Sequence, residues 1–120
     1  MKEYQLTEAE LRFAEIIWAN APVSSPTLVK LCESGLNWKK STTYTMLKRL
    51  ESKGVFENRS GTVYALLSKE EFYAEQSKQF VAQAFDGSLP RFLTAFTRNK
   101  KLSDREIHEL QRLIDEYKEV

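Results

Sequence analysis

Eighteen residues, N-W-K-K-S-T-T-Y-T-M-L-K-R-L-E-S-K-G at Asn37–Gly54, constrain the fold more than any other part of the chain. At 3.6 residues per turn, this segment predicts a helix with two different sides. The apolar side carries Thr43, Met46, Leu47 and Leu50. The segment ends in a glycine, which can take the left-handed conformation common at helix ends. We therefore expect a helix that packs on a core through one side and leaves the other side free.

The free side of this helix combines hydroxyl groups with positive charge. It carries Ser41, Thr42, Tyr44, Thr45, Lys48 and Arg49, and it is preceded by Lys39 and Lys40. No acidic residue interrupts Asn37–Leu50, so phosphate groups are attracted to both ends of the helix, while the hydroxyls of its first turns can contact bases. We also expect the hydroxyls of residues 41–43 to cap the first turn. A merely solvated helix has a similar composition, so both interpretations stay open for this segment alone.

The neighbouring segments predict the rest of a small domain. Capping signals at Thr7–Glu10 and Ser24–Pro26 open two earlier helices. After the third helix, two β-rich runs at 55–58 and 62–67 are joined by the turn Arg59–Gly61. Three helices followed by a hairpin are typical of a winged helix-turn-helix domain, which favours DNA binding by the third helix. The wing would contact phosphate or the minor groove, with Arg59 as its cation, although an ordinary polar turn has a similar composition.

Beyond residue 67 the pattern becomes helical and rich in aromatic residues. Three expected helices are too few and too short to enclose a core, so we expect their apolar faces to pair with a second copy of the chain. The candidate dimerisation residues are Phe80, Leu89, Phe92, Leu93, Phe96, Ile107, Leu110, Leu113, Ile114 and Tyr117. Packing of this tail onto the winged domain is the alternative. The predicted fold is mainly α with a small β-hairpin, with a winged helix-turn-helix DNA-binding domain at 1–68 and a helical dimerisation domain at 69–120.

Composition limits the classes of function. The formal net charge is only +1, so attraction to nucleic acid depends on where the charges lie. Residues 1–68 carry nine Lys and Arg against seven Asp and Glu, whereas residues 69–120 carry nine against ten. The single cysteine, Cys32, is expected to be a buried or half-buried small hydrophobe. Because we find neither a signal peptide nor a long apolar run, we expect a cytoplasmic protein without membrane insertion.

The sequence carries no pattern typical of catalysis. The one histidine, His108, has no second histidine or neighbouring cysteine to complete a metal site or a nucleophile pair. The four glycines are scattered singly and form no phosphate-binding loop. We therefore predict no enzymatic activity, no metal site and no cofactor.

Several separated motifs in a fixed order carry a resemblance to a known family. They are L-T-x-A-E-x-x-F-x-x-I-I-W at 6–18, W-x-x-S-T-x-Y-T-x-L-x-R-L-x-x-K-G at 38–54, D-G-S-L at 86–89 and L-S-D-R-E-I-H-E-L at 102–110. With these motifs the chain resembles the penicillinase repressor family, the repressors of β-lactamase and methicillin-resistance genes and of copper transport. The resemblance implies a homodimeric transcriptional repressor that binds palindromic operators in double-stranded DNA through an N-terminal winged helix.

The same resemblance implies roles for individual residues. Ser41, Thr42, Tyr44 and Thr45 would read or frame bases, with Arg49 on a phosphate. Antibiotic-responsive members are inactivated when a membrane metalloprotease sensor leads to a cut in the C-terminal segment, at a position that looks like Ala95–Phe96 here. The well-known repressors have asparagine in place of Ala95, which leaves cleavage open. The copper-responsive branch has a C-terminal cysteine cluster, whereas this chain ends in D-E-Y-K-E-V, which argues against copper sensing by that route.

Two further functions stay open. A winged helix can serve as a protein-interaction module without binding DNA. The chain could also be a ligand-responsive regulator that is not induced by proteolysis. Operator-selective DNA binding would exclude the first, and release of DNA by a ligand without a cut would favour the second.

Overall fold

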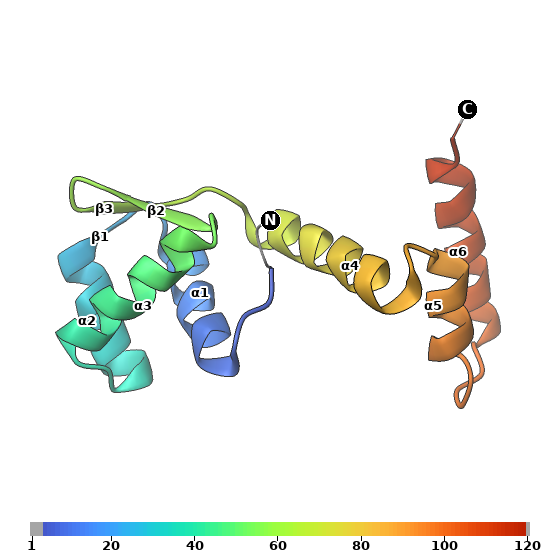
Figure 1. Cartoon of the computed structure of the whole chain (residues 1–120), viewed down its shortest axis with the longest axis horizontal. Helices are drawn as coiled ribbons and strands as arrows, with labels where there is room; N and C mark the ends of the chain where they lie inside the picture. The colour runs from blue at the N-terminus through green and yellow to red at the C-terminus, as the bar shows by residue number, and fades with distance from the viewer. Residues whose placement is uncertain (1–3, 120) are drawn as a thin grey trace. The chain divides into compact units, whose positions relative to one another are not determined.

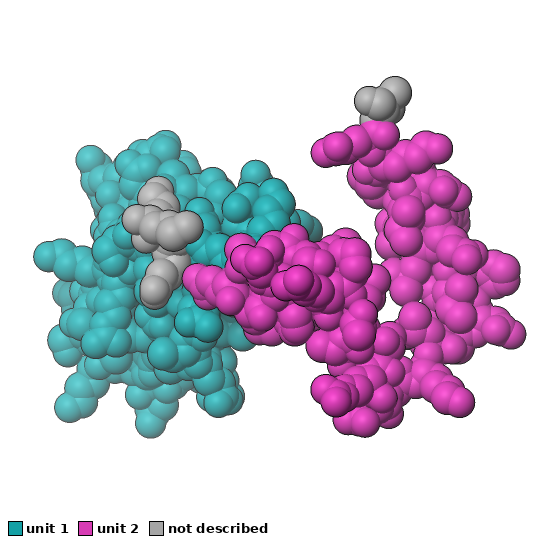
Figure 2. Space-filling model, turned by 45° about the vertical axis from the view of Figure 1, so that its right-hand side comes forward, with its two compact units in different colours: residues 1–79 teal, residues 80–120 magenta. Residues whose placement is uncertain are grey.

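Six helices and three strands make up the described residues, 4–119, of the computed structural model (Figure 1). They are α1 (Glu8–Asn20), β1 (Val23–Ser24), α2 (Ser25–Leu36), α3 (Lys40–Ser52), β2 (Phe56–Arg59), β3 (Thr62–Ala65), α4 (Lys69–Phe85), α5 (Leu89–Phe96) and α6 (Asp104–Tyr117). The predicted fold class is confirmed: the chain is mainly α and begins with a winged helix. It divides into two compact units, residues 1–79 and 80–120, which Figure 2 shows in different colours.

Capping side chains start most of the helices. The predicted capping box of α1 is present, since the Thr7 hydroxyl accepts from the Glu10 N–H while the Glu10 carboxylate accepts from the Thr7 N–H. Ser24 caps α2, and Pro26 stands in its first turn. Ser103 and Glu106 form the same reciprocal pair at α6. The starts of these three helices are therefore determined by residues close to them in the sequence.

The small sheet contains one strand more than the predicted hairpin. Strands β2 and β3 are antiparallel, with Arg59 opposite Thr62 across a turn whose residues Ser60 and Gly61 have φ values of 49° and 91°. The short strand β1 pairs with the other edge of β3, with Val23 opposite Val63. This third strand anchors the wing to the chain just before α2.

The core of the first unit lies between its three helices and the sheet. Its buried apolar residues are Phe13, Ala14, Ile17, Val23, Leu28, Cys32, Met46, Leu47, Leu50, Val55, Phe56, Val63 and Phe72. The expected burial of Cys32 is confirmed, and burial raises the pKa of its thiol. This core holds α3 in place by its apolar side.

The beginning of α4 also belongs to this core. Phe72 is fully buried and packs with its ring against Trp18 (5.4 Å between centroids) and Tyr4 (5.9 Å). The Gln76 side chain donates to the Tyr4 carbonyl at 2.9 Å, and the Tyr4 N–H donates to Gln79 at 3.0 Å. The first unit therefore extends to residue 79, while the functional boundary predicted at residue 68 stays a prediction.

The second unit is a small helical assembly with an aromatic cluster. The rings of Phe80, Phe85 and Phe92 lie 5.6–6.2 Å apart in edge-to-face pairs, and Phe96 follows at 6.0 Å from Phe92. None of the residues of α5 and α6 is fully buried. Large apolar side chains of this unit therefore remain in contact with solvent.

Candidate DNA-binding surface

Helix α3 has the two sides that its spacing predicts. The buried residues are Thr43, Met46, Leu47 and Leu50. On the other side, Lys39, Lys40, Ser41, Thr42, Thr45, Lys48 and Arg49 are exposed, while Tyr44 is half-buried. The structure therefore brings all the α3 residues that we selected as candidates for DNA contact onto the solvent side of one helix.

The first turn of α3 differs from the prediction. The N-cap is Lys39, and its side chain makes no capping hydrogen bond. The hydroxyls of Thr43 and Thr45 donate backwards, to the carbonyls of Lys39 at 3.4 Å and Ser41 at 2.9 Å. The prediction that the hydroxyls of 41–43 cap the helix is therefore wrong, because these residues lie inside the helix rather than before it.

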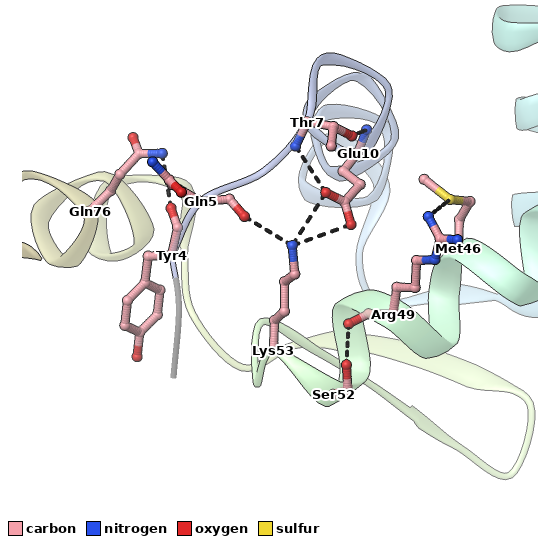
Figure 3. Close-up of polar contacts among 9 residues, drawn as sticks. All are labelled: Tyr4, Gln5, Thr7, Glu10, Met46, Arg49, Ser52, Lys53 and Gln76. Atoms are coloured by element: carbon pink, nitrogen blue, oxygen red, sulfur yellow. Dashed lines mark hydrogen bonds and ion pairs between the residues drawn. The ribbon is translucent and has the colours of Figure 1, made fainter. Parts of the chain in front are cut away.

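Positive charge on the exposed side of α3 has no acidic partner in the described chain. Lys39, Lys40, Lys48 and Arg49 are absent from all salt bridges formed among residues 4–119. The Arg49 guanidinium makes only a weak contact with the Met46 sulfur at 3.8 Å (Figure 3). Unpaired cations spaced along one helix attract a polyanion such as DNA.

Lys53, at the end of α3, is a cation with a different role. Its ammonium donates to the Gln5 carbonyl at 2.9 Å and lies 3.2 and 3.3 Å from the two carboxylate oxygens of Glu10 (Figure 3). The Glu10 side chain is only 4% exposed. The Lys53 charge is therefore used inside the fold, where it fastens the end of α3 to the start of α1.

The predicted cation of the wing is held in a defined position. The Arg59 guanidinium pairs with the Glu57 carboxylate at 3.2 Å and lies 4.7 Å from the centre of the Tyr64 ring. Its side chain is still 56% exposed. Arg59 therefore stands beside the tip of the hairpin and remains accessible to a ligand.

An open hollow of about 310 Å³ lies between α3 and the wing. Its lining consists of Tyr44, Thr45, Leu47, Lys48, Glu51 and Asn58. Glu51 and Asn58 were not predicted as part of this surface, because a carboxylate repels phosphate and the amide carries no charge. The Glu51 carboxylate accepts from the backbone N–H of Asn58 at 3.2 Å, so it joins the helix to the wing.

A comparison with known protein families shows which family the chain is related to. The family described as penicillinase repressor matches residues 6–116, almost the entire chain. The chain belongs to the penicillinase repressor family. The resemblance that the sequence motifs indicated is thereby confirmed, and the chain is a DNA-binding transcriptional repressor rather than an enzyme.

Individual members of the penicillinase repressor family match over nearly their full length. A penicillinase repressor of Bacillus licheniformis is 27% identical over 118 residues, which are 95% of this chain and 92% of the relative. The methicillin resistance regulatory protein MecI of Staphylococcus aureus strain Mu50 is 25% identical, with 95% and 96% covered. A penicillinase repressor of Staphylococcus aureus is 22% identical, with 96% and 94% covered.

The predicted dimerisation residues of this family member share one property, which is incomplete burial. Phe80, Leu89, Phe96, Ile107, Leu113, Ile114 and Tyr117 are exposed, while Phe92, Leu93 and Leu110 are half-buried. A groove of about 290 Å³ between α5 and α6 is lined mainly by apolar residues of this set, with Leu102, Glu106 and Glu109 beside them. The structure thus gathers part of the set around one groove and leaves the others on the surface.

The predicted cleavage position, Ala95–Phe96, lies at the end of α5. Both Ala95 and Phe96 are exposed, and the carbonyl of Ala95 accepts from the N–H groups of Thr97 and Arg98. Proteases bind their substrates in extended form, so a cut here requires the last turn of α5 to open first.

No helix among the described residues is long and apolar enough to cross a membrane.

Proposed function

We propose that the chain acts in the cytoplasm as a homodimer that represses transcription by occupying palindromic operators in double-stranded DNA. The observation that carries this proposal is the exposed side of α3, where hydroxyls and unpaired cations share one surface. In a winged helix this third helix enters the major groove. Occupation of a promoter then blocks the polymerase by steric exclusion.

Affinity and sequence choice would come from different residues of this surface. Lys39, Lys40, Lys48 and Arg49 would hold phosphates, and Arg59 would add a contact from the wing. Ser41, Thr42, Tyr44 and Thr45 would face base edges, where hydroxyls and methyl groups distinguish base pairs. The exposure of these side chains supports both assignments.

Dimerisation would be the task of residues 69–120, while residues 1–68 bind DNA. The exposed apolar residues of α5 and α6 support this division, because large apolar side chains in water favour association. Two copies related by a twofold axis match the two halves of a palindromic site. A single half-site offers much less binding energy than two.

Relief of repression would follow from proteolysis at Ala95–Phe96 that is linked to a membrane sensor. Such a cut separates α5 from α6 in the chain and so removes part of the apolar surface. Co-expression with the sensor of a penicillinase-producing relative, followed by mass spectrometry of the repressor, tests this step. An intact chain in cells that nevertheless derepress would support a ligand-responsive mechanism instead.

A gel-shift experiment with genomic fragments at several salt concentrations tests the proposed DNA binding. We expect selective binding of a few fragments, with a loss of affinity on the order of 1,000-fold between about 50 and 200 mM salt for about six phosphate contacts. Equal binding of all fragments at low salt would contradict sequence-specific repression. Absence of any binding would instead favour a protein-interaction module.

A further inference from the structure

Glu51 is a carboxylate at a place where DNA binding alone would not put one. It lies in the last turn of α3, directly after the acid-free segment 37–50, and it lines the hollow between α3 and the wing. It forms no salt bridge among the described residues. A negative charge this close to Lys48 and the proposed phosphate contacts weakens the attraction to DNA, so it needs another use.

The hydrogen bonds of Glu51 indicate that use. Its carboxylate accepts from the backbone N–H of Asn58 in β2 at 3.2 Å. The Asn58 side-chain oxygen in turn accepts from the N–H of Gly61 at 3.0 Å, which closes the turn of the wing. Gly61 then offers its carbonyl to the N–H and the hydroxyl of Ser25 in α2, at 2.8 and 3.0 Å.

These bonds hold the wing turn from two sides. On one side, Ser25 fixes the tip against the start of α2, and on the other side Glu51 fixes the strand against the end of α3. Arg59 follows Asn58 directly in the chain. The bond to Glu51 therefore ties the backbone of β2 directly before Arg59 to the end of α3, while Glu57 and Tyr64 hold the Arg59 guanidinium itself.

We propose that Glu51 is a positioning residue for DNA binding, which sets the wing so that Arg59 meets a phosphate when α3 lies in the major groove. This inference rests on the proposed DNA contacts of α3 and the wing. A wing already in place loses less conformational freedom on binding than a mobile hairpin does. That gain offsets the repulsion between the carboxylate and the DNA.

A double-mutant cycle tests the role of Glu51. Glu51→Gln removes the charge but keeps an oxygen that accepts from Asn58, whereas Glu51→Ala removes both. Each is combined with Arg59→Ala, and affinity for an operator duplex is measured by fluorescence anisotropy at several salt concentrations. Thermal unfolding of every variant shows whether the domain is intact.

We expect Arg59→Ala to weaken binding about tenfold in the wild type and in Glu51→Gln, as for loss of a charged hydrogen bond, but less than about twofold in Glu51→Ala. The slope of log Kd against log salt should decrease in Glu51→Ala by about the amount expected for one lost phosphate contact. In Glu51→Gln this slope should stay unchanged. The same tenfold loss in both Glu51 backgrounds would overturn the positioning role while leaving DNA binding intact. If the wild type binds no operator, the proposed function itself fails.

Discussion

Thr45 and Arg49 lie one turn apart on α3, yet their polar groups are bound differently. The Thr45 hydroxyl donates to the Ser41 carbonyl at 2.9 Å, and its methyl group is left for an apolar contact. Among residues 4–119, the Arg49 guanidinium has only the weak contact with the Met46 sulfur. A short side chain near the first turns suits base contact, whereas a long unpaired cation suits phosphate.

We expect substitutions of these two residues to act differently. Thr45→Ala should reduce the preference for the operator over an altered operator by about five- to 150-fold, since good base contacts discriminate by about 1–3 kcal/mol. Arg49→Ala should weaken binding to both duplexes by a similar factor and reduce the salt dependence. Competition titrations with paired duplexes measure both effects. Uniform weakening by both substitutions would contradict the assignment of roles.

The Glu10–Lys53 pair makes the stability of the first unit depend on pH. Burial raises the pKa of the Glu10 carboxyl, but the hydrogen bond from the Thr7 N–H and the contact with the Lys53 ammonium outweigh it, so the pKa is lowered overall. A lowered pKa in the folded state stabilises the fold above the ordinary value of 4.5, and this contribution disappears as pH falls through the folded value.

We therefore expect Glu10→Gln to lower the free energy of unfolding by about 1–3 kcal/mol at pH 7, since the ammonium loses its charged acceptor. The difference from the wild type should shrink as pH falls below about 4.5 towards 3, because protonation of Glu10 removes the same charge. Urea titrations across this pH range measure the free energy of unfolding of both proteins and so the difference between them. Glu8→Gln, at an exposed position in the same helix, is the control and should change stability little. A constant difference at all pH values would contradict this account.

Among the elements, the helices and the hairpin could be predicted, whereas the shortest strand, β1, could not. The apolar side of α3 follows from helical spacing, as do the capping boxes of α1 and α6. Strand β1 has only two residues, and pairing with β3 rather than local pattern makes it a strand. The predicted capping of α3 by the hydroxyls of residues 41–43 is wrong because threonine hydroxyls can either cap a helix or donate to a carbonyl one turn back.

Glu51 shows what sequence reasoning about the site leaves out. An acidic residue at the end of a basic helix has the sequence pattern of an ordinary surface charge. Neither its charge nor its spacing predicts which backbone group its carboxylate will contact. Its bond to Asn58 depends on how the hairpin packs against α3, which is a tertiary contact. The cations and hydroxyls of α3 were predictable because they lie on one face of one helix.

Helix α4 permits a test of how its two halves differ. Phe72→Ala should lower the free energy of unfolding of the first unit by about 3–5 kcal/mol, because it empties a fully buried site. Phe80→Ala, at 51% exposure, should change that transition by less than about 1 kcal/mol. Both tryptophans, Trp18 and Trp38, lie in the first unit, so their fluorescence reports its unfolding alone. Equal losses would contradict the placement of Phe72 in the core.

For the whole molecule, the central expectation is that pairing of two chains controls operator affinity. Ile114→Asp places a charge at an apolar position of α6 that is 59% exposed, so it should weaken self-association with little effect on the unit's own packing. Sedimentation should then show monomers where the wild type forms dimers. Arg112→Asp, on the same helix but at an exposed polar position, is the matched control and should stay dimeric.

The same pair of variants links dimerisation to DNA binding. Duplexes with two half-sites should bind the wild type and Arg112→Asp at least about 100-fold more tightly than duplexes with one, whereas Ile114→Asp should lose most of this preference. Fluorescence anisotropy with both duplexes measures the ratio. If Ile114→Asp stays dimeric, the interface lies elsewhere in the chain.

The three acceptors around the Lys53 ammonium also affect its chemistry towards amine-specific reagents. The Lys53 nitrogen is held by the Gln5 carbonyl and the Glu10 carboxylate, and its side chain is only 26% exposed, so a reagent reaches it less readily than it reaches the exposed lysines. Acetylation should therefore label Lys39, Lys40 and Lys48 well before Lys53. On addition of operator DNA, the first three should become protected while Lys53 changes little. The order in which lysines react would thus outline the bound face of the repressor.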